Sequence, residues 1–169
     1  EAVPPGPETS VDVEEDAYIP DDYLSNNVER LNLYRRISDA PDEETLVDIY
    51  EEMDDRFGDV PKPVEHLLTA AQLRLLGEQL RLPKVLYKNE RLFLYLPTEE
   101  ADPYFYEEVF QPLLQELSTL DREYVLKDQK DKNLLRAIVQ DVPTLDDAHT
   151  VIEAIQLPDT ATVATTAEG

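Results

Sequence analysis

The chain has 169 residues, of which 41% are hydrophobic and 31% charged, so it is long enough for one domain, or two very small ones, with a proper core. Thirty-eight Asp and Glu against fifteen Lys and Arg give a formal net charge of −23, and such an acidic field repels phosphate backbones and anionic lipid surfaces. The lack of cysteine excludes disulfides, thiolate zinc sites, iron–sulfur clusters and cysteine nucleophiles. Because of its acidic charge, direct DNA binding is a poor first hypothesis for this chain.

The two ends of the chain differ in composition from its middle. Residues 1–16 combine prolines with acidic side chains and hold little apolar surface, which predicts a linker. Residues 158–169 are mostly small and show no periodicity, which predicts a flexible tail. No stretch approaches the roughly 20 apolar residues that a bilayer span needs, and the first residues do not resemble a signal peptide. We expect one soluble, cytoplasmic domain over residues 17–157, in a fragment or processed product because the chain begins with Glu.

Three helices are predicted in the first half. The first is indicated by an apolar stripe that ends before a proline: Val28, Leu31, Tyr34 and Ile37. The second is indicated by a stripe with acids in its first turn and Gly58 as its stop: Leu46, Tyr50, Met53 and Phe57. The third follows two prolines, from about Val64 to Leu82: Leu67, Leu68, Ala71, Leu75 and Leu82.

The second half changes to strand periodicity. Residues 84–97 contain two apolar runs joined by a polar break of hairpin length, and 124–128 with 133–142 resemble a second strand pair. Asp102 suits a helix N-cap, although Pro112 must kink or restart that helix. Thr144 with Asp147 resembles a capping box for a last helix. The expected fold class is α+β: three N-terminal helices followed by a small antiparallel sheet packed with two further helices.

No motif for catalysis or cofactor binding is found in the sequence. The four glycines are too scattered for a phosphate-binding loop, and His66 and His149 lie far apart. Carboxylate pairs are so abundant that no single pair indicates acid–base catalysis. We therefore predict no catalytic residue, no cofactor, no metal site and no enzyme activity for this domain.

Two clusters of residues leave alternatives open. The first cluster is basic, and it is typical either of a charged hairpin connection or of a nucleic-acid contact: Arg122, Lys127, Lys130, Lys132 and Arg136. The second is aromatic and favours the core over a ligand pocket: Tyr104, Phe105, Tyr106 and Phe110. One rival function is therefore a small-ligand or protein-interaction module with an aromatic-edged pocket. Another is a hydrolase built on a buried carboxylate pair.

The second predicted helix carries an unusual acidic strip. Asp48, Glu52 and Asp55 fall on the face away from its apolar stripe, joined by Glu51 and Asp54. Acids in the last two turns oppose the helix dipole and one another, so local stability would not select them. A solvated face remains one explanation. The sharper hypothesis is a docking strip for an arginine-rich surface, carried by Glu52, Asp55, Asp48 and Glu51.

Two longer segments carry a resemblance to a known family. DAYIPDDYLSNNVERLNLYRRISDA and EEMDDRFGDVPKPVEHLL resemble the C-terminal domain of bacterial transcription-repair coupling factor (Mfd), over roughly Val11 to Leu157. The Ala-Tyr-Ile-Pro and Asp-Arg-Phe-Gly segments are its most specific parts. The sheet-containing half matches in the order of its elements more than in its residues.

The resemblance implies a regulatory role without catalysis. In that family the parent protein is a DNA translocase that acts with RNA polymerase and recruits the excision-repair machinery through UvrA. The C-terminal domain docks on the N-terminal UvrA-binding module and restrains both UvrA recruitment and translocation. Glu52 and Asp55 match the family's Glu-x-x-Asp-Arg-Phe motif, whose carboxylates face arginines of that module. The implied function is an autoinhibitory domain that neither binds nucleic acid nor contacts a membrane.

Overall fold

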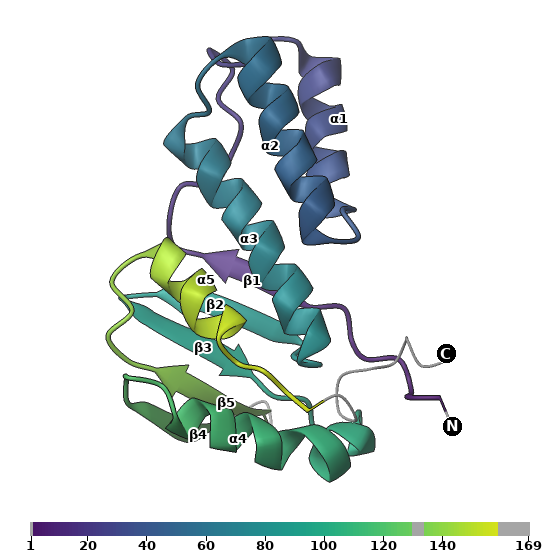
Figure 1. The fold of residues 1–169 in the computed structure, drawn as a ribbon, viewed down its shortest axis with the longest axis vertical. Helices are drawn as coiled ribbons and strands as arrows, with labels where there is room; N and C mark the ends of the chain where they lie inside the picture. Colours follow the sequence, from purple (N-terminus) through teal and green to yellow (C-terminus); the bar gives the residue numbers. More distant parts are fainter. Residues whose placement is uncertain (1, 130–133, 159–169) are drawn as a thin grey trace.

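The computed structural model describes residues 2–129 and 134–158 as five α-helices, a short π-helix and a five-stranded sheet (Figure 1). The elements run in chain order as follows: β1 (Ser10–Val13), α1 (Asn27–Ser38), α2 (Glu43–Phe57), α3 (Lys62–Gln79), β2 (Lys84–Lys88), β3 (Arg91–Tyr95), η1 (Phe105–Val109), α4 (Phe110–Ser118), β4 (Tyr124–Gln129), β5 (Leu134–Val139) and α5 (Leu145–Glu153). The predicted α+β fold class is confirmed.

Helix α3 connects two lobes, each with its own core. Leu68, Ala71 and Leu75 face a helical lobe that α1 and α2 complete. Leu73 and Leu80 face a second core, which also includes the inner face of the sheet, α4 and α5. Figure 1 shows the helical lobe above and the sheet below, with α3 running from one to the other.

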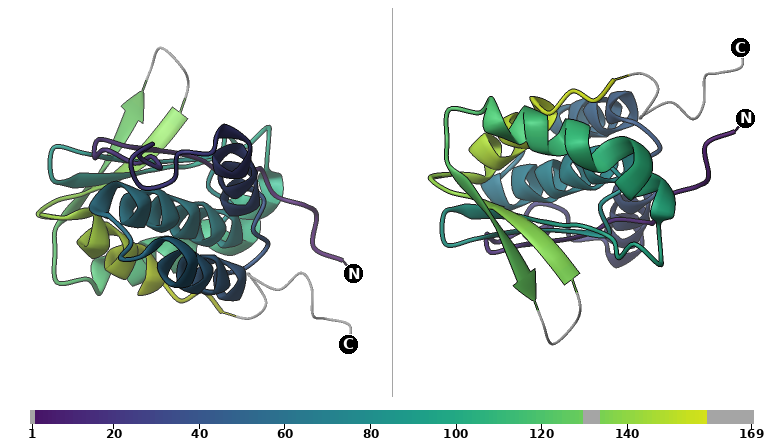
Figure 2. Two further views of the ribbon diagram at one scale, coloured as in Figure 1. Left: turned by 90° about the horizontal axis from the view of Figure 1, so that it is seen from above. Right: turned by 90° about the horizontal axis from the view of Figure 1, so that it is seen from below.

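The sheet is mixed and has helices on one side. Its strand order is β1-β2-β3-β5-β4, in which β2, β3, β5 and β4 pair antiparallel and β1 pairs parallel with β2. Helices α3, α4 and α5 pack against one face, and both views of Figure 2 show these three helices on the same side of the sheet. Side chains alternate between the two faces along each strand. We call the face that these helices cover the inner face and the opposite one the outer face.

The first strand differs from our prediction of a linker over residues 1–16. Ser10–Val13 pairs with Lys84–Tyr87 of β2, and Val11 and Val13 pack against the core of the sheet lobe. The two valines alternate with polar residues, a period-two signal that the surrounding acids and prolines obscured. Apart from Pro158, the predicted tail lies outside the described residues.

The buried face of helix α1 differs from the apolar stripe that we predicted for it. Leu33 and Ile37 are buried and Tyr34 is half-buried, but Val28 and Leu31 are 70% and 60% exposed. The spacing of apolar residues predicted the position of the helix correctly but not its inner face, because two overlapping sets of apolar residues both have helical spacing. Helix α3 ends at Gln79, three residues before the predicted Leu82.

Local backbone chemistry explains two other features of the sheet lobe. The β2–β3 hairpin turns on Asn89 and Glu90, which have φ values of 54° and 58°, as a tight two-residue turn requires. Before Pro112 the chain forms the π-helical turn η1, since proline lacks an N–H and its ring clashes with the preceding turn. No helix in the described ranges is long and apolar enough to cross a membrane.

Candidate docking surface on helix α2

Helix α2 is well defined at both ends. The Asp42 carboxylate accepts hydrogen bonds from the Thr45 backbone N–H at 2.9 Å and the Thr45 hydroxyl at 2.7 Å. These bonds and the first-turn acids Glu43 and Glu44 complement the positive end of the helix dipole. Gly58 ends the helix with φ 91°, a conformation that favours glycine. The helix is therefore a rigid support for the side chains on its surface.

The buried stripe of α2 fixes which side chains face outward. Leu46, Ile49 and Met53 are buried in the helical lobe. On the opposite side Asp48, Glu51 and Asp55 are exposed, and none of the three side chains has a hydrogen bond or ion pair with a described residue. Three of the four predicted docking residues thus present free carboxylates to solvent.

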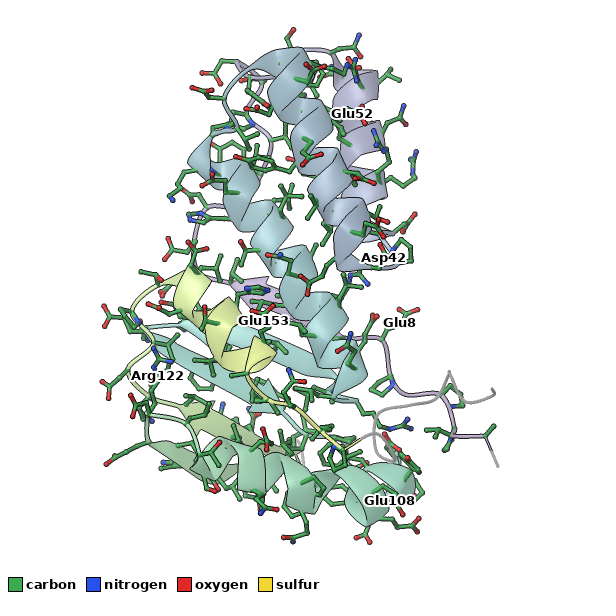
Figure 3. All side chains as sticks on the ribbon, viewed as in Figure 1. Glu8, Asp42, Glu52, Glu108, Arg122 and Glu153 are labelled. Carbon is green, nitrogen blue, oxygen red and sulfur yellow. The ribbon has the colours of Figure 1, made fainter. Side chains whose placement is uncertain are left out.

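Glu52, the fourth predicted residue, lies toward α1 (Figure 3). Its Oε1 accepts from Arg36 Nη2 at 2.7 Å, and its Oε2 accepts from Arg36 Nη1 and from Arg56 Nη1, each at 3.1 Å. Arg56 also pairs with Glu29 of α1. The charges alternate from Arg36 to Glu52, Arg56 and Glu29, so the network is neutral and joins α1 to α2.

The network affects the pKa of the Glu52 carboxyl. Hydrogen bonding from Arg36 is the main cause that lowers the pKa of this carboxyl from its ordinary value, with Arg56 adding to it. Glu52 consequently stays ionised at neutral pH, with its charge compensated from within the chain. An incoming guanidinium would have to compete with Arg36 and Arg56 for Glu52, but it would find no such competitor at Asp55.

An apolar rim borders the free acids on the α3 side. Val47 is 51% exposed and Tyr50 37% exposed. Both line a hollow of about 300 Å³, whose other walls include Leu68 and Gln72 of α3. A partner at this surface would meet free carboxylates and a shallow apolar recess side by side, the mixture found in protein–protein interfaces.

The family motifs quoted above mainly build the helical lobe. In the Ala-Tyr-Ile-Pro segment Ile19 is buried, and its backbone N–H donates to the Tyr34 hydroxyl at 2.8 Å. The Tyr23 hydroxyl donates to the carbonyls of Met53 and Gly58, while its ring packs edge-on against Phe57 at 5.9 Å. These residues hold the N-terminal segment against the C-terminal end of α2.

A buried ion pair was not predicted from the sequence. Arg81, just after α3, donates from Nε and Nη2 to the Asp102 carboxylate at 2.8 and 3.0 Å, and the two side chains are only 7% and 8% exposed. Arg81 also donates to the carbonyls of Pro4 and Pro5, and its guanidinium lies over the Tyr104 ring. The one available signal was Asp102 as an N-cap, which gave no indication of its partner.

The two rival functions gain no support from this geometry. The Phe105 side chain is fully buried, with its ring edge-on to Tyr106 and tilted against Phe110, so the aromatic cluster belongs mainly to the core and its edge. Across the described ranges Asp102 is the one buried carboxylate, and its neighbour is Arg81. A buried pair of acids of the kind a hydrolase needs is thus not formed by these residues.

The two histidines differ in their surroundings. His66 Nδ1 contacts the Asp16 carbonyl at 2.9 Å, and because a carbonyl only accepts, this nitrogen donates. His149, Glu43 and Glu153 bring potential ligand atoms within 4.8 Å of one another. Acidic neighbours are common on a chain of this charge, so this grouping alone does not define a metal site.

Part of the predicted basic cluster lies outside the described residues, namely Lys130 and Lys132. Arg122 Nε donates to the Asp141 carbonyl at 3.0 Å, which ties the start of β4 to the end of β5. Lys127 and Arg136 sit opposite each other in β4 and β5.

The fold resembles a solved domain. It matches the "Crystal structure of C-terminal domain of transcription-repair coupling factor" with a TM-score of 0.72 over 90% of this chain and 94% of that one, at 18% sequence identity. At this identity the likeness establishes the architecture.

Sequence comparisons establish the family. The TRCF domain model matches residues 13–105, more than half of the chain, so the chain belongs to the TRCF domain family. It is 35% identical over 94 residues to the transcription-repair-coupling factor of Bacillus subtilis (strain 168), covering 56% of this chain and 8% of that protein. The corresponding protein of Staphylococcus haemolyticus (strain JCSC1435) is 30% identical over 116 residues, covering 67% and 10%. The match thus spans about a tenth of the length of these relatives.

Proposed function

We propose that this chain is a non-catalytic, autoinhibitory domain of a cytoplasmic DNA translocase that couples transcription to nucleotide excision repair. It docks through α2 on an arginine-bearing N-terminal module of the same protein, the module that binds UvrA. In the docked state it restrains UvrA recruitment and translocation. Engagement of the parent protein with RNA polymerase on DNA releases it.

One observation carries the proposal: the outward face of α2 keeps three carboxylates free, while Glu52 beside them is paired with Arg36 and Arg56. Asp48, Glu51 and Asp55 have no cationic partner among the described residues, although Arg36 and Arg56 lie on the same lobe and pair with other acids. Free acids beside the exposed Val47 and Tyr50 suit a partner that offers guanidinium groups and a small apolar contact.

The expected strength suits a reversible latch. Exposed ion pairs contribute about 0–1 kcal/mol each, and burial of apolar surface adds about 25 cal/mol per Å². Three pairs and a small apolar contact therefore stabilise a closed state by a few kcal/mol, which a stronger partner can overcome. Glu52 contributes indirectly, because its network fixes α1 against α2 and so presents the free acids.

Charge reversal in the full-length parent protein tests this function. We expect Asp48→Lys with Glu51→Lys and Asp55→Lys to raise UvrA affinity by about tenfold and to increase translocation, since each lost pair opens the closed state. The matched control reverses three exposed acids of the sheet lobe, Glu107, Glu108 and Asp121, to Lys. UvrA binding is measured by calorimetry and translocation by triplex displacement. Equal responses of the two triple variants would count against docking through α2.

A further inference from the structure

The outer face of the sheet collects cations from four strands. The strand register places five basic residues on this face, away from the helices: Lys84, Lys88, Arg91, Lys127 and Arg136. They make up one third of the fifteen Lys and Arg in a chain that has thirty-eight acids. Among the described strand residues, Asp12 of β1 is the one acid that the register places on the same face. A locally cationic surface on so acidic a protein requires an explanation.

These cations are not neutralised within the described ranges. Five other cations of the chain do form ion pairs: Arg36, Arg56, Lys62, Arg74 and Arg81. Among the residues that the structure describes, no carboxylate lies within ion-pair distance of an outer-face cation. Arg136 makes one long hydrogen bond, to the Tyr95 hydroxyl at 3.4 Å, and its buried Nε has no partner. The guanidinium retains donors that no carboxylate of the described chain uses.

An apolar centre lies among these charges. Phe93, Tyr95 and Ile138 form a small cluster with the partly buried Leu86 and Leu134. Next to it Val125 of β4 is 41% exposed. Cations therefore surround an aliphatic and aromatic centre on the sheet face opposite to α3, α4 and α5.

The two rings of the cluster are already occupied by cations. The Phe93 ring has the Arg91 and Arg136 guanidiniums at 5.2 and 5.5 Å from its centroid, and the Tyr95 ring has the Lys84 ammonium at 5.3 Å. Both aromatic residues are only 7% exposed. The rings hold the cations in place and leave no free face on which a base could stack.

We propose that the outer face of the sheet binds an acidic, extended segment of a partner protein in which Asp or Glu and apolar residues take turns at every second position. The carboxylates pair with Lys88, Lys127 and the guanidiniums, and the apolar side chains contact Leu86 and Val125. In an extended segment successive side chains point to opposite sides, so residues spaced by two meet the sheet together. This surface is separate from α2 and serves a different partner from the cationic module proposed above.

Charge and scale favour a protein segment over nucleic acid. Salt limits the reach of the cationic face to a Debye length of about 8 Å at physiological ionic strength. A long polyanion would extend beyond the face and meet the field of a molecule whose net charge is −23. A short acidic segment fits within the cationic area and also uses the apolar centre.

Binding of a fluorescein-labelled peptide of repeating Glu-Ser-Leu-Ser to the 169-residue chain tests the proposal by fluorescence anisotropy, because its Glu and Leu side chains lie on one side of the extended peptide. We expect saturable binding that weakens with salt and falls about tenfold in Lys88→Glu with Lys127→Glu. The matched control, Arg35→Glu with Lys62→Glu, makes the same change in net charge on the helical lobe, and we expect it to bind like the parent chain. A peptide of repeating Lys-Ser-Leu-Ser meets the free acids of α2 instead, so its binding should not weaken in Lys88→Glu with Lys127→Glu.

Four results would overturn the proposal. They are no binding of the acidic peptide, equal losses in the two double variants, and tighter binding of single-stranded oligothymidylate than of the peptide in the same buffer. The fourth is concentration-dependent self-association in sedimentation experiments that Lys88→Glu with Lys127→Glu abolishes, which would assign the face to a second copy of the chain.

Discussion

The α1–α2 surface and the outer face of the sheet use their charges in opposite ways. Between α1 and α2, Arg36 and Arg56 are paired with Glu52 and Glu29, so cations neutralise acids and bind two helices together. On the sheet, Lys88 and the other outer-face cations have no carboxylate partner within residues 2–129 and 134–158, and they surround an apolar centre. The role of a charged residue therefore depends on its partners more than on its position along a helix or strand.

The largest expected effect concerns the buried ion pair between Arg81 and Asp102, from which solvent is excluded. Arg81→Met leaves the Asp102 carboxylate buried without its cation, so we expect a loss of about 3–5 kcal/mol in the free energy of unfolding, measured in urea. Arg81→Met with Asp102→Leu should recover part of that loss, because no uncompensated charge remains. A loss below about 1 kcal/mol, as for exposed pairs, would contradict the structural role given to this pair.

The next effect concerns how the first strand is held against α3. A Cβ at Gly77 would lie 2.6 Å from the Thr9 γ-methyl, so Gly77→Ala is expected to destabilise by about 1–3 kcal/mol despite a helix-propensity gain of about 1 kcal/mol. Adding Thr9→Ser removes the methyl but keeps the hydroxyl that donates to the Leu82 carbonyl, and should restore stability. Stabilisation of the chain by Gly77→Ala alone, measured by thermal unfolding, would contradict the close approach of Gly77 to Thr9.

A smaller effect separates Glu52 from its exposed neighbour. Glu52→Gln should lower the free energy of unfolding by no more than about 1 kcal/mol at pH 7, and Asp55→Asn should change it less, since only Glu52 is paired. The folded-state pKa of Glu52 is lowered from 4.5, so its stabilisation is present above that pH and is lost as the pH falls through the lower value. The difference between wild type and Glu52→Gln should therefore disappear in acid. A difference that grows toward low pH would contradict the network.

Elements with a single dominant pattern could be predicted from the sequence. Helix α2, the hairpin around Asn89 and the β4–β5 pair have clear caps, turns or alternation, and the structure contains them. The face of α1 could not be fixed, because Leu31 and Leu33 compete for the interior and only packing decides. Strand β1 was missed because its stability depends on pairing with a segment some seventy positions away.

The candidate site was predictable only in part, for the same reason. Helical spacing correctly placed Asp48 and Asp55 outward, but the partner of Glu52 is Arg36, on another helix. The cations of the sheet come from segments that are separate in the sequence, and only strand register brings Lys88 and Lys127 to one face. Tertiary pairing, and not local pattern, determines which charges remain available.

The most direct test of the α2 docking account is a pull-down of this chain with the separately expressed N-terminal module of its parent protein, at low and high ionic strength. We predict binding at low salt that falls about tenfold in Asp48→Asn with Glu51→Gln and Asp55→Asn, falls again as salt is raised, and changes little in Glu52→Gln. Binding that depends on Glu52 but not on the three free acids, or that is insensitive to salt, would contradict it.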